Sequence, residues 1–582
     1  MGDNQMAGSH TPEIPRTTAA EMLACFDSDF AGFAAAFVKG QYVVWLGSGL
    51  SREVVPDVSS LLRNLLVHLQ ERVDNADTEC RYRRALREIV AIGALPGDDQ
   101  SAIDFSAEVA TWPALDDLIS RLVGQYSKVL DVVVDDEDRD YLVWDAIDAA
   151  GVYGDDTLNP DAEHICVAIL MLEGVIRAAP TTNWDGLIEL AVDRLSGNRS
   201  GILRVVVHQD DFLGPAARAD LIKFHGCAVR AKADPGIYRD LLVARHLQIS
   251  GWTASPANKI TKDHLEHLVA TRPALVVGLS AQDANIHTIL HEARQNMHRS
   301  WPDVPPAVAF ALHSLGPDQT HVLDITYGDD YFPNRQQINQ AALLGGYAKP
   351  VLLGLVLFTI ADKLCSLVEG LSDLGFSEAG VARLQGDIRV IRDLASESAI
   401  DARAFVDELV SAVCFILETF RTGSPPPSGS MHYAALTAHP TSDEAADPNF
   451  PGQVLGWLAV AVSLLGRGCS GGFWTIRAGD PSEPKNGQVR VDVPGSPLSK
   501  VFVAQGAAAV SRLVADGYLD ESDPDVLLVY AEDPAPRPVR SPSPKLGRTR
   551  KLGVREVSME TLCRDAEDAD DLFNLFRLGA GL

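Results

Sequence analysis

Short apolar runs recur along the first half of the chain, and each ends in a polar or glycine-containing turn. Residues 42–46 form the first run, residues 47–51 (Gly-Ser-Gly-Leu-Ser) form its turn, and residues 59–73 then place leucines at helical spacing. A strand, a glycine turn and a helix in this order are typical of the first βα unit of a nucleotide-binding sheet. The glycines let backbone approach a phosphate, although the same residues also occur in ordinary tight turns.

Three further apolar runs, at residues 174–179, 221–224 and 274–277, have the same form. The polar and glycine residues that follow them are Thr182, Asn183, Asp185, His225, Gly278, Ser280, Asp283 and Asn285. Because the carboxyl ends of parallel strands share one edge of a sheet, we expect these residues to converge on one ligand site. Taken singly, Asn183 and Asp185 are also good helix N-caps, and a single histidine after a strand is more often structural.

The whole pattern predicts an α/β protein with a Rossmann-like parallel sheet, an inserted helical subdomain, a helical region and a small C-terminal α/β module. Further strands are expected at 205–207 and 307–312, and in the C-terminal module at 472–476, 489–493, 501–503 and 526–530. The predicted divisions are a tail or helix at 1–29, a catalytic domain at 30–334 with a helical insertion at about 52–172, a helical region at 335–420, a flexible linker at 421–452 and the C-terminal module at 453–582.

Taken together, the four turns resemble those of the sirtuin family and its bacterial sirtuin-like NADase relatives, over about residues 30 to 315. The resemblance implies that NAD is bound and consumed. It assigns Asn183 to the nicotinamide ribose and the attacking water, Asp185 to steadying the same loop, and His225 to general base catalysis. The residues that it places on the rest of NAD are Gly47, Ser48, Gly49, Ser51, Thr182, Gly278, Ser280, Asp283 and Asn285.

Departures from the family pattern indicate which kind of sirtuin-like protein the chain resembles. A deacetylating sirtuin carries two Cys pairs for zinc between the histidine and the Gly-Ser strand, but here that interval holds only Cys227. Residues 52–57 replace the expected Gly-Ile-Pro-Asp-Phe-Arg segment, and Thr182 replaces a glutamine. The resemblance therefore implies a metal-free NAD+ hydrolase of the anti-phage, abortive-infection type. A non-catalytic NAD or ADP-ribose sensor or scaffold, and an NAD-dependent deacylase or ADP-ribosyltransferase, are the alternatives.

Composition favours a cytoplasmic protein. Eight cysteines are scattered without a CxxC pair, as in a reducing compartment, and the N-terminus has no signal-peptide pattern. The apolar runs at 351–361 and 454–465 are shorter than the roughly 20 residues of a membrane span, so no membrane contact is expected. The histidine pairs His264/His267 and His287/His291 are interpreted as packing or surface residues, because a third metal ligand at useful spacing is not visible.

The net charge of −29 opposes general nucleic-acid binding. One segment, residues 537–555, runs against this balance, with seven Lys and Arg residues and no acid. It is either a solvated loop or a contact for an acidic partner or a nucleic acid. An enzyme that drains NAD has to be silent until triggered, so we expect a homo-oligomer with a protein partner. By analogy with relatives, a HerA-like ATPase is the first candidate and a short Argonaute the second.

Overall fold

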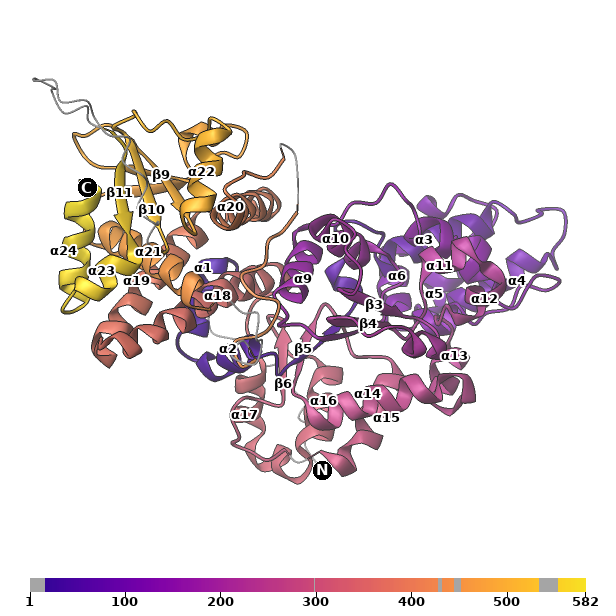
Figure 1. The fold of residues 1–582 in the computed structure, drawn as a ribbon. Helices are drawn as coiled ribbons and strands as arrows, with labels where there is room; N and C mark the ends of the chain where they lie inside the picture. Colours follow the sequence, from indigo (N-terminus) through magenta and orange to yellow (C-terminus); the bar gives the residue numbers. More distant parts are fainter. Residues whose placement is uncertain (1–15, 298, 428–431, 444–451, 533–552) are drawn as a thin grey trace, which may run out of the picture.

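The computed structural model describes the chain except for residues 1–15, 298, 428–431, 444–451 and 533–552. At its centre lies a six-stranded parallel sheet with the order β3-β4-β2-β1-β5-β6 (Figure 1). The strands are β1 (Val43–Leu46), β2 (Ala178–Thr181), β3 (Leu203–Val206), β4 (Ala219–Lys223), β5 (Ala274–Val277) and β6 (Val308–Ala311). The α/β class with a parallel sheet, predicted from the sequence, is confirmed.

The register aligns the carboxyl ends of the four central strands. Leu46 of β1 pairs with both Thr181 of β2 and Val277 of β5, and Thr181 pairs with Lys223 of β4. The turns after these strands therefore leave the sheet at one edge. The order of the strands reverses between β1 and β5, and this is the point at which open α/β sheets bind ligands.

Strand β2 begins later than the sequence predicts. The apolar run starts at Gly174, whereas the ladder starts at Ala178. Gly174 has a φ of +73°, and the Val175 N–H donates to the carbonyl of Leu170, so these residues close the preceding helix. Their apolar side chains are buried as a helix end and not as a strand.

Alternate side chains of the sheet face two helical layers. Val44 and Leu46 share a hydrophobic core with the first layer, and Val43 and Trp45 share one with the second. The first layer contains α1 (Ala19–Phe26), α2 (Ala31–Val38), α9 (Ala162–Leu172), α10 (Leu187–Ser196) and α18 (Ala348–Val368). The second contains α14 (Lys259–Thr271), α15 (Ala284–Ala293), α16 (Pro317–Tyr327) and α17 (Tyr331–Ala342).

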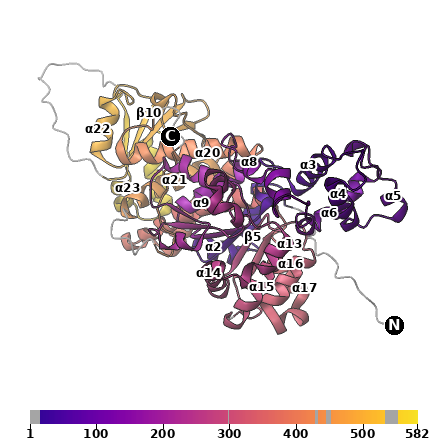
Figure 2. The same cartoon turned by 90° about the vertical axis from the view of Figure 1, so that its right-hand side faces the viewer.

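A helical insertion separates β1 from β2 and has a hydrophobic core of its own. Its elements are η1 (Ser48–Leu50), α3 (Val58–Gln70), α4 (Arg81–Ile92), α5 (Gly97–Ser101), η2 (Val109–Thr111), α6 (Leu115–Val123), α7 (Tyr126–Val129), the π-helical turn η3 (Leu142–Ala146) and α8 (Ala149–Tyr153). Figure 2 shows α3 to α6 projecting on the side away from the C-terminal sheet. Helix α9, at the end of the same interval, instead packs in the central core.

Short helices connect the later strands. They are η4 (Gln209–Leu213), α11 (Ala228–Ala233), α12 (Pro235–Tyr238), η5 (Arg239–Leu241), α13 (His246–Gly251), η6 (Trp252–Ala254), η7 (Pro256–Asn258), η8 (Arg294–Asn296) and η9 (Gly328–Asp330). Of these, α13 and η6 contribute Ile249 and Trp252 to the core on the β5–β6 side of the sheet.

The C-terminal part contains a second sheet with the order β11-β10-β9-β8-β7, in which β9, β10 and β11 are parallel and β7 and β8 antiparallel. Its strands are β7 (Thr475–Ala478), β8 (Val489–Asp492), β9 (Ser499–Ala504), β10 (Val526–Tyr530) and β11 (Arg555–Ser558). The helices around it are η10 (Glu369–Leu374), α19 (Glu378–Glu397), α20 (Ala402–Thr422), α21 (Gly452–Ser470), η12 (Pro484–Asn486), α22 (Ala507–Ala515), α23 (Met559–Asp565) and α24 (Ala569–Ala580). Strand β11 was not anticipated from the sequence.

Two helices among the described residues are long and apolar enough to span a membrane, at residues 348–374 and 452–470. The lengths of the apolar runs alone had predicted that neither could do so. Their most apolar windows are each 67% buried inside the protein, as in core helices. Helix α18 in particular packs in two cores, with Val351 in that of the central sheet and Val368 in that of the C-terminal part.

A buried ion pair fastens α18 to the central sheet domain. Lys363 Nζ lies 2.6 Å from Glu173 Oε2, and both side chains are inaccessible to solvent. Lys363 also donates to Thr437 Oγ1 at 2.9 Å, and the Tyr433 hydroxyl donates to the other oxygen of Glu173 at 2.7 Å. These contacts hold part of the segment whose composition predicts a flexible linker. The domain boundaries themselves remain a prediction.

Candidate active site

A cavity of about 860 Å³ opens at the carboxyl edge of the central sheet. Ten of the residues selected from the sequence line it, namely Ser48, Gly49, Ser51, Thr182, Asn183, Asp185, His225, Gly278, Ser280 and Asp283. Gly47 and Asn285 lie behind the wall. The insertion supplies further wall residues, among them Leu62, Leu65 and Tyr126, and the first turn of α18 supplies Lys349.

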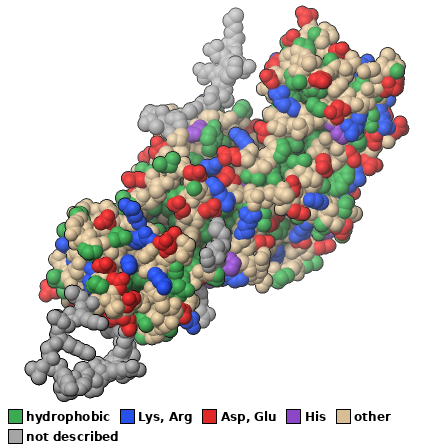
Figure 3. Space-filling view, turned by 90° about the horizontal axis from the view of Figure 1, so that it is seen from above, with side chains coloured by type: hydrophobic (Ala, Val, Ile, Leu, Met, Phe, Trp, Pro, Cys, Tyr) green, Lys and Arg blue, Asp and Glu red, His purple; other side chains and the backbone are tan. Residues whose placement is uncertain are grey.

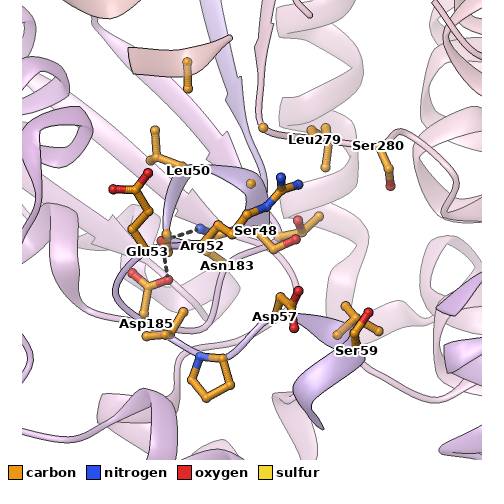
Figure 4. Close-up of a pocket in the computed structure, with 18 of the residues that line it drawn as sticks. Ser48, Leu50, Arg52, Glu53, Asp57, Ser59, Asn183, Asp185, Leu279 and Ser280 are labelled. Atoms are coloured by element: carbon orange, nitrogen blue, oxygen red, sulfur yellow. Dashed lines mark hydrogen bonds between the residues drawn. The ribbon is translucent and has the colours of Figure 1, made fainter. Parts of the chain in front are cut away.

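The glycines of the first turn are required by the fold itself. Gly49 N–H donates to the Gly278 carbonyl at 2.9 Å, so the turns after β1 and β5 lie against each other. A Cβ atom on Gly47 would stand 2.5 Å from the Leu279 Cα, and one on Gly49 would stand 2.8 Å from the Gly278 Cα. Any larger residue would therefore force the two turns apart. Ser48, which is exposed, turns its side chain toward the cavity (Figure 4).

Ser51 is the centre of a buried hydrogen-bond network. Its hydroxyl accepts from Asn183 Nδ2 at 3.1 Å, donates to Asp185 Oδ2 at 2.9 Å, and lies 3.0 Å from His164 Nε2. His164 Nδ1 accepts from the Asp161 N–H at 3.1 Å, so Nε2 carries the ring proton and donates it to Ser51. The hydroxyl of Ser51, only 1% exposed as a residue, is thus fully engaged by protein groups and holds the loop after β2.

This network fixes the orientation of Asn183. Because the amide nitrogen is held by Ser51, Oδ1 lies on the opposite side of the amide group. Oδ1 is buried and has no hydrogen-bond partner among the described residues. A buried amide oxygen without a partner is costly, so this atom is suited to a bound water or a ligand hydroxyl.

Asp185 holds its loop in place through both side-chain oxygens. Oδ2 accepts from Ser51, and Oδ1 accepts from the Leu187 N–H at 3.2 Å. Lys223, at the end of β4, lies beneath this loop and donates to the Asp185 carbonyl and to Glu189 Oε1, the latter at 2.8 Å. Burial opposes the charge of Lys223, but Glu189 and the other negative groups around it raise its pKa above the usual value, so it stays charged.

His225 follows β4 and is 3% exposed. Burial lowers its pKa below the usual value, while the Asp283 carboxylate and the Asn285 amide oppose that shift. The ring is therefore neutral at pH 7. Asn285 Nδ2 lies 2.9 Å from His225 Nε2. If Asn285 Nδ2 donates to His225 Nε2, the ring proton lies on Nδ1. If the Asn285 amide is instead turned by 180°, its oxygen accepts from Nε2–H, and Nδ1 carries no proton and can act as a base.

The remaining predicted contacts are arranged around these groups. Thr182 is half-buried, and its N–H donates to the Leu46 carbonyl at 3.3 Å. The Ser280 carbonyl accepts from the side chain of Gln319, and the Ser280 side chain is exposed. Asp283 accepts from the Tyr126 hydroxyl at 2.8 Å. Asn183 and His225 thus line one cavity, and neither packs away from it.

Sequence reasoning missed His164, Lys223 and Tyr126. His164 lies within the apolar run of α9, where a histidine carries no recognisable spacing, and Lys223 resembles an ordinary strand residue. Tyr126 lies far from Asp283 in the chain. One signal in the sequence could have indicated His164 and Lys223. A charged or polar residue inside an apolar element is buried only where it has hydrogen-bond or charge partners, so such a residue points to a polar network.

The described residues contain no group of three or more His, Cys, Asp and Glu that could hold a metal ion. The ring of His264 packs on Phe212, and that of His287 packs on His321. All but one of the cysteines are buried as free thiols, and Cys469 is half-buried.

Most of the basic segment 537–555 lies outside the described residues. Its last member, Arg555, is in β11 and donates to the Ala580 carbonyl at 2.8 Å and to Ser499 Oγ at 2.9 Å, so this arginine serves the C-terminal fold. On the face of the molecule seen in Figure 3, positive and negative side chains are interspersed.

Comparison with known proteins gives one family match. Residues 177–327 match the family model of the SIR2-like domain, a domain of NAD-dependent enzymes, and a search of curated proteins finds no match. The matched part runs from the start of β2 to the end of α16 and includes Asn183 and His225. The first turn lies outside it, on β1, which pairs with β5 inside it. Residues 177–327, which carry the amide and the imidazole of the cavity, are therefore similar to the SIR2-like domain.

Proposed function

We propose that this protein hydrolyses NAD+ to ADP-ribose and nicotinamide. The observation that carries the proposal is the free amide oxygen of Asn183, buried in the cavity that His225 also lines. The SIR2-like domain supports NAD as the substrate. The cavity lies at the edge where parallel sheets bind nucleotides, beside a glycine turn.

The chemistry asks little of the protein beyond orientation. The bond between ribose C1′ and the pyridinium nitrogen breaks, and its electron pair stays on the nitrogen, so nicotinamide leaves as a neutral molecule. C1′ acquires oxocarbenium character, as in glycoside hydrolysis, and a water oxygen then bonds to it. Asn183 Oδ1 would accept a hydrogen bond from this water or from a ribose hydroxyl, and His225 would accept the released proton.

The test is direct. The purified chain is incubated with NAD, and nicotinamide and ADP-ribose are measured by chromatography. Asn183→Ala and His225→Ala should each abolish the release of nicotinamide without loss of folding. Asn75→Ala and His291→Ala, both at exposed positions, are the matched controls and should retain activity. Full activity in the Asn183 or the His225 variant would contradict the proposed mechanism.

The same assay separates the alternatives. A sensor or scaffold would bind NAD without turnover, and a deacylase would release nicotinamide only with an acylated substrate. The interval between His225 and Gly278 holds a single cysteine, Cys227, which argues against a four-thiolate zinc module of the deacetylating kind.

We further propose that the hydrolysis depletes NAD during phage infection, in the cytoplasm, and that a partner triggers it in a homo-oligomeric assembly. The support is the resemblance to defence-type relatives, among which a HerA-like ATPase is the first candidate partner and a short Argonaute the second. Co-purification with the product of the neighbouring gene tests this. A solitary monomer with full activity would contradict the partner proposal.

A further inference from the structure

The cavity wall contains one hydrogen bond that joins the insertion to the sheet domain at the His225 side. The Tyr126 hydroxyl, in α7 of the insertion, donates to Asp283 Oδ1 at 2.8 Å, and both residues line the cavity. The Tyr126 ring packs against the core of the insertion and also against the core on the β5–β6 side of the sheet. Tyr126 is thus a joint between two separately packed parts.

Asp283 does not cap its helix with its side chain. It occupies the N-cap position of α15, where an aspartate commonly accepts from the helix backbone, yet its side chain makes no capping hydrogen bond. Its carboxylate goes to Tyr126 instead. Two residues further on, Asn285 Nδ2 meets His225 Nε2 at 2.9 Å. One short turn therefore carries both the anchor for the insertion and the partner of the histidine.

We propose that Tyr126 is a positioning residue for the active site, which anchors the turn 283–285 and through it sets the orientation and proton affinity of His225. The inference rests on the proposed NAD hydrolysis and adds to it the requirement that the insertion be docked. An undocked insertion leaves this turn without its anchor and His225 without a fixed partner.

The groups around His225 make the effect measurable. The ring is packed against Phe224 and Asn285, and Asp283 is the charged residue that acts on it. Asp283 also acts on His287 of α15, whose own pKa is lowered mainly by burial. Loss of the Tyr126 hydroxyl would admit water to the His225 side and leave Asp283 with one donor fewer. Both changes favour the protonated imidazole.

Tyr126→Phe is the first variant, because it removes only the hydroxyl and keeps the ring in both cores. We expect kcat for nicotinamide release to fall by about tenfold or more, since a hydrogen bond to a charged group corresponds to roughly 10- to 150-fold in rate, with KM for NAD little changed. The acidic limb of the kcat–pH profile should move to higher pH. Asp283→Asn keeps an acceptor for Tyr126 but removes the charge, so its limb should move to lower pH.

Tyr82→Phe is the matched control. Its hydroxyl donates to Glu137 at 3.0 Å inside the same insertion, and neither residue lines the cavity. It should leave kcat and its pH profile as in the wild type. A merely structural role of Tyr126 would lower the active fraction without moving the acidic limb.

Hydrogen–deuterium exchange of the full chain gives a readout that needs no turnover. Tyr126→Phe should speed exchange in peptides covering 281–290 and 222–230, and Tyr82→Phe should not. If the wild type releases no nicotinamide, the hydrolase proposal fails while exchange still decides the positioning role. Exchange and pH profile in Tyr126→Phe that match those of Tyr82→Phe would overturn the inference.

Discussion

Ser51 offers the sharpest test of how the site is built, because its hydroxyl serves three buried neighbours at once. Ser51→Ala removes the acceptor for Asn183 Nδ2 and for His164 Nε2–H, and removes the donor to Asp185 Oδ2. The Asn183 amide can then rotate, so that in a fraction of the molecules Oδ1 is no longer in position to accept a hydrogen bond from the water or the ribose hydroxyl.

The magnitude follows from these bonds. A buried polar group left without its partner costs about 1–3 kcal/mol. One such loss in the reacting state corresponds to about tenfold in rate, and two correspond to about a hundredfold. We therefore expect kcat for NAD hydrolysis to fall between about ten- and a hundredfold. KM should change less, since the hydroxyl is covered by protein groups.

The assay is steady-state nicotinamide release by Ser51→Ala, with the folded state checked by thermal melting. Ser396→Ala is the control, because Ser396 is also buried and its hydroxyl donates to the Asp393 carbonyl of its own helix, at 2.7 Å. A kcat for Ser51→Ala equal to that of Ser396→Ala would refute the claim that Ser51 orients the amide.

Three further predictions address pH, stability and the glycine turn. The folded pKa of His225 lies below its usual value of about 6.5, so the base stays neutral to lower pH and the acidic limb of kcat should fall below 6.5; a limb above that value would contradict the assignment. In the same window the unfolded chain binds more protons than the folded one, so stability should decrease as the pH falls toward the folded pKa. Lys363→Met breaks the buried ion pair described above and should destabilise the fold by about 3–5 kcal/mol in urea unfolding. Lys259→Met, at an exposed pair, should cost less than about 1 kcal/mol, and equal midpoints would speak against a role for burial. Gly47→Ala should cost about 1–3 kcal/mol and weaken NAD binding in calorimetry, because its Cβ would meet the Leu279 Cα; unchanged binding would show that the turns can separate freely.

The central sheet could be predicted because its strands are short, mostly apolar and bounded by turns. Strands β1 and β4 lie near their expected positions, β5 matches residue for residue, and β2 begins four residues later than expected. Parallel order alone then brought Asn183 and His225 to one cavity. Local chemistry was sufficient for this step, since the carboxyl ends of parallel strands meet whatever connects them.

The partners of these side chains could not be predicted. Ser51 meets His164 across 113 positions and Asp185 across 134, and Tyr126 meets Asp283 across 157. Such contacts depend on how the insertion and α9 pack, which no local pattern encodes. The start of β2 was predicted four residues too early, at Gly174. Apolar residues buried at the end of a helix and apolar residues buried in a strand look alike in the sequence.

Helix α18 makes the central sheet domain and the C-terminal part of the chain mutually dependent, because it contributes to the hydrophobic core of each. Its first turn borders the cavity, and its far end packs among α19, α21 and the second sheet. A truncation ending at residue 334 would remove α18 from the first helical layer and expose the apolar core residues that it covers to water. The intact polypeptide is therefore the form to study, and a movement of the C-terminal part would be transmitted through α18 to the wall of the cavity.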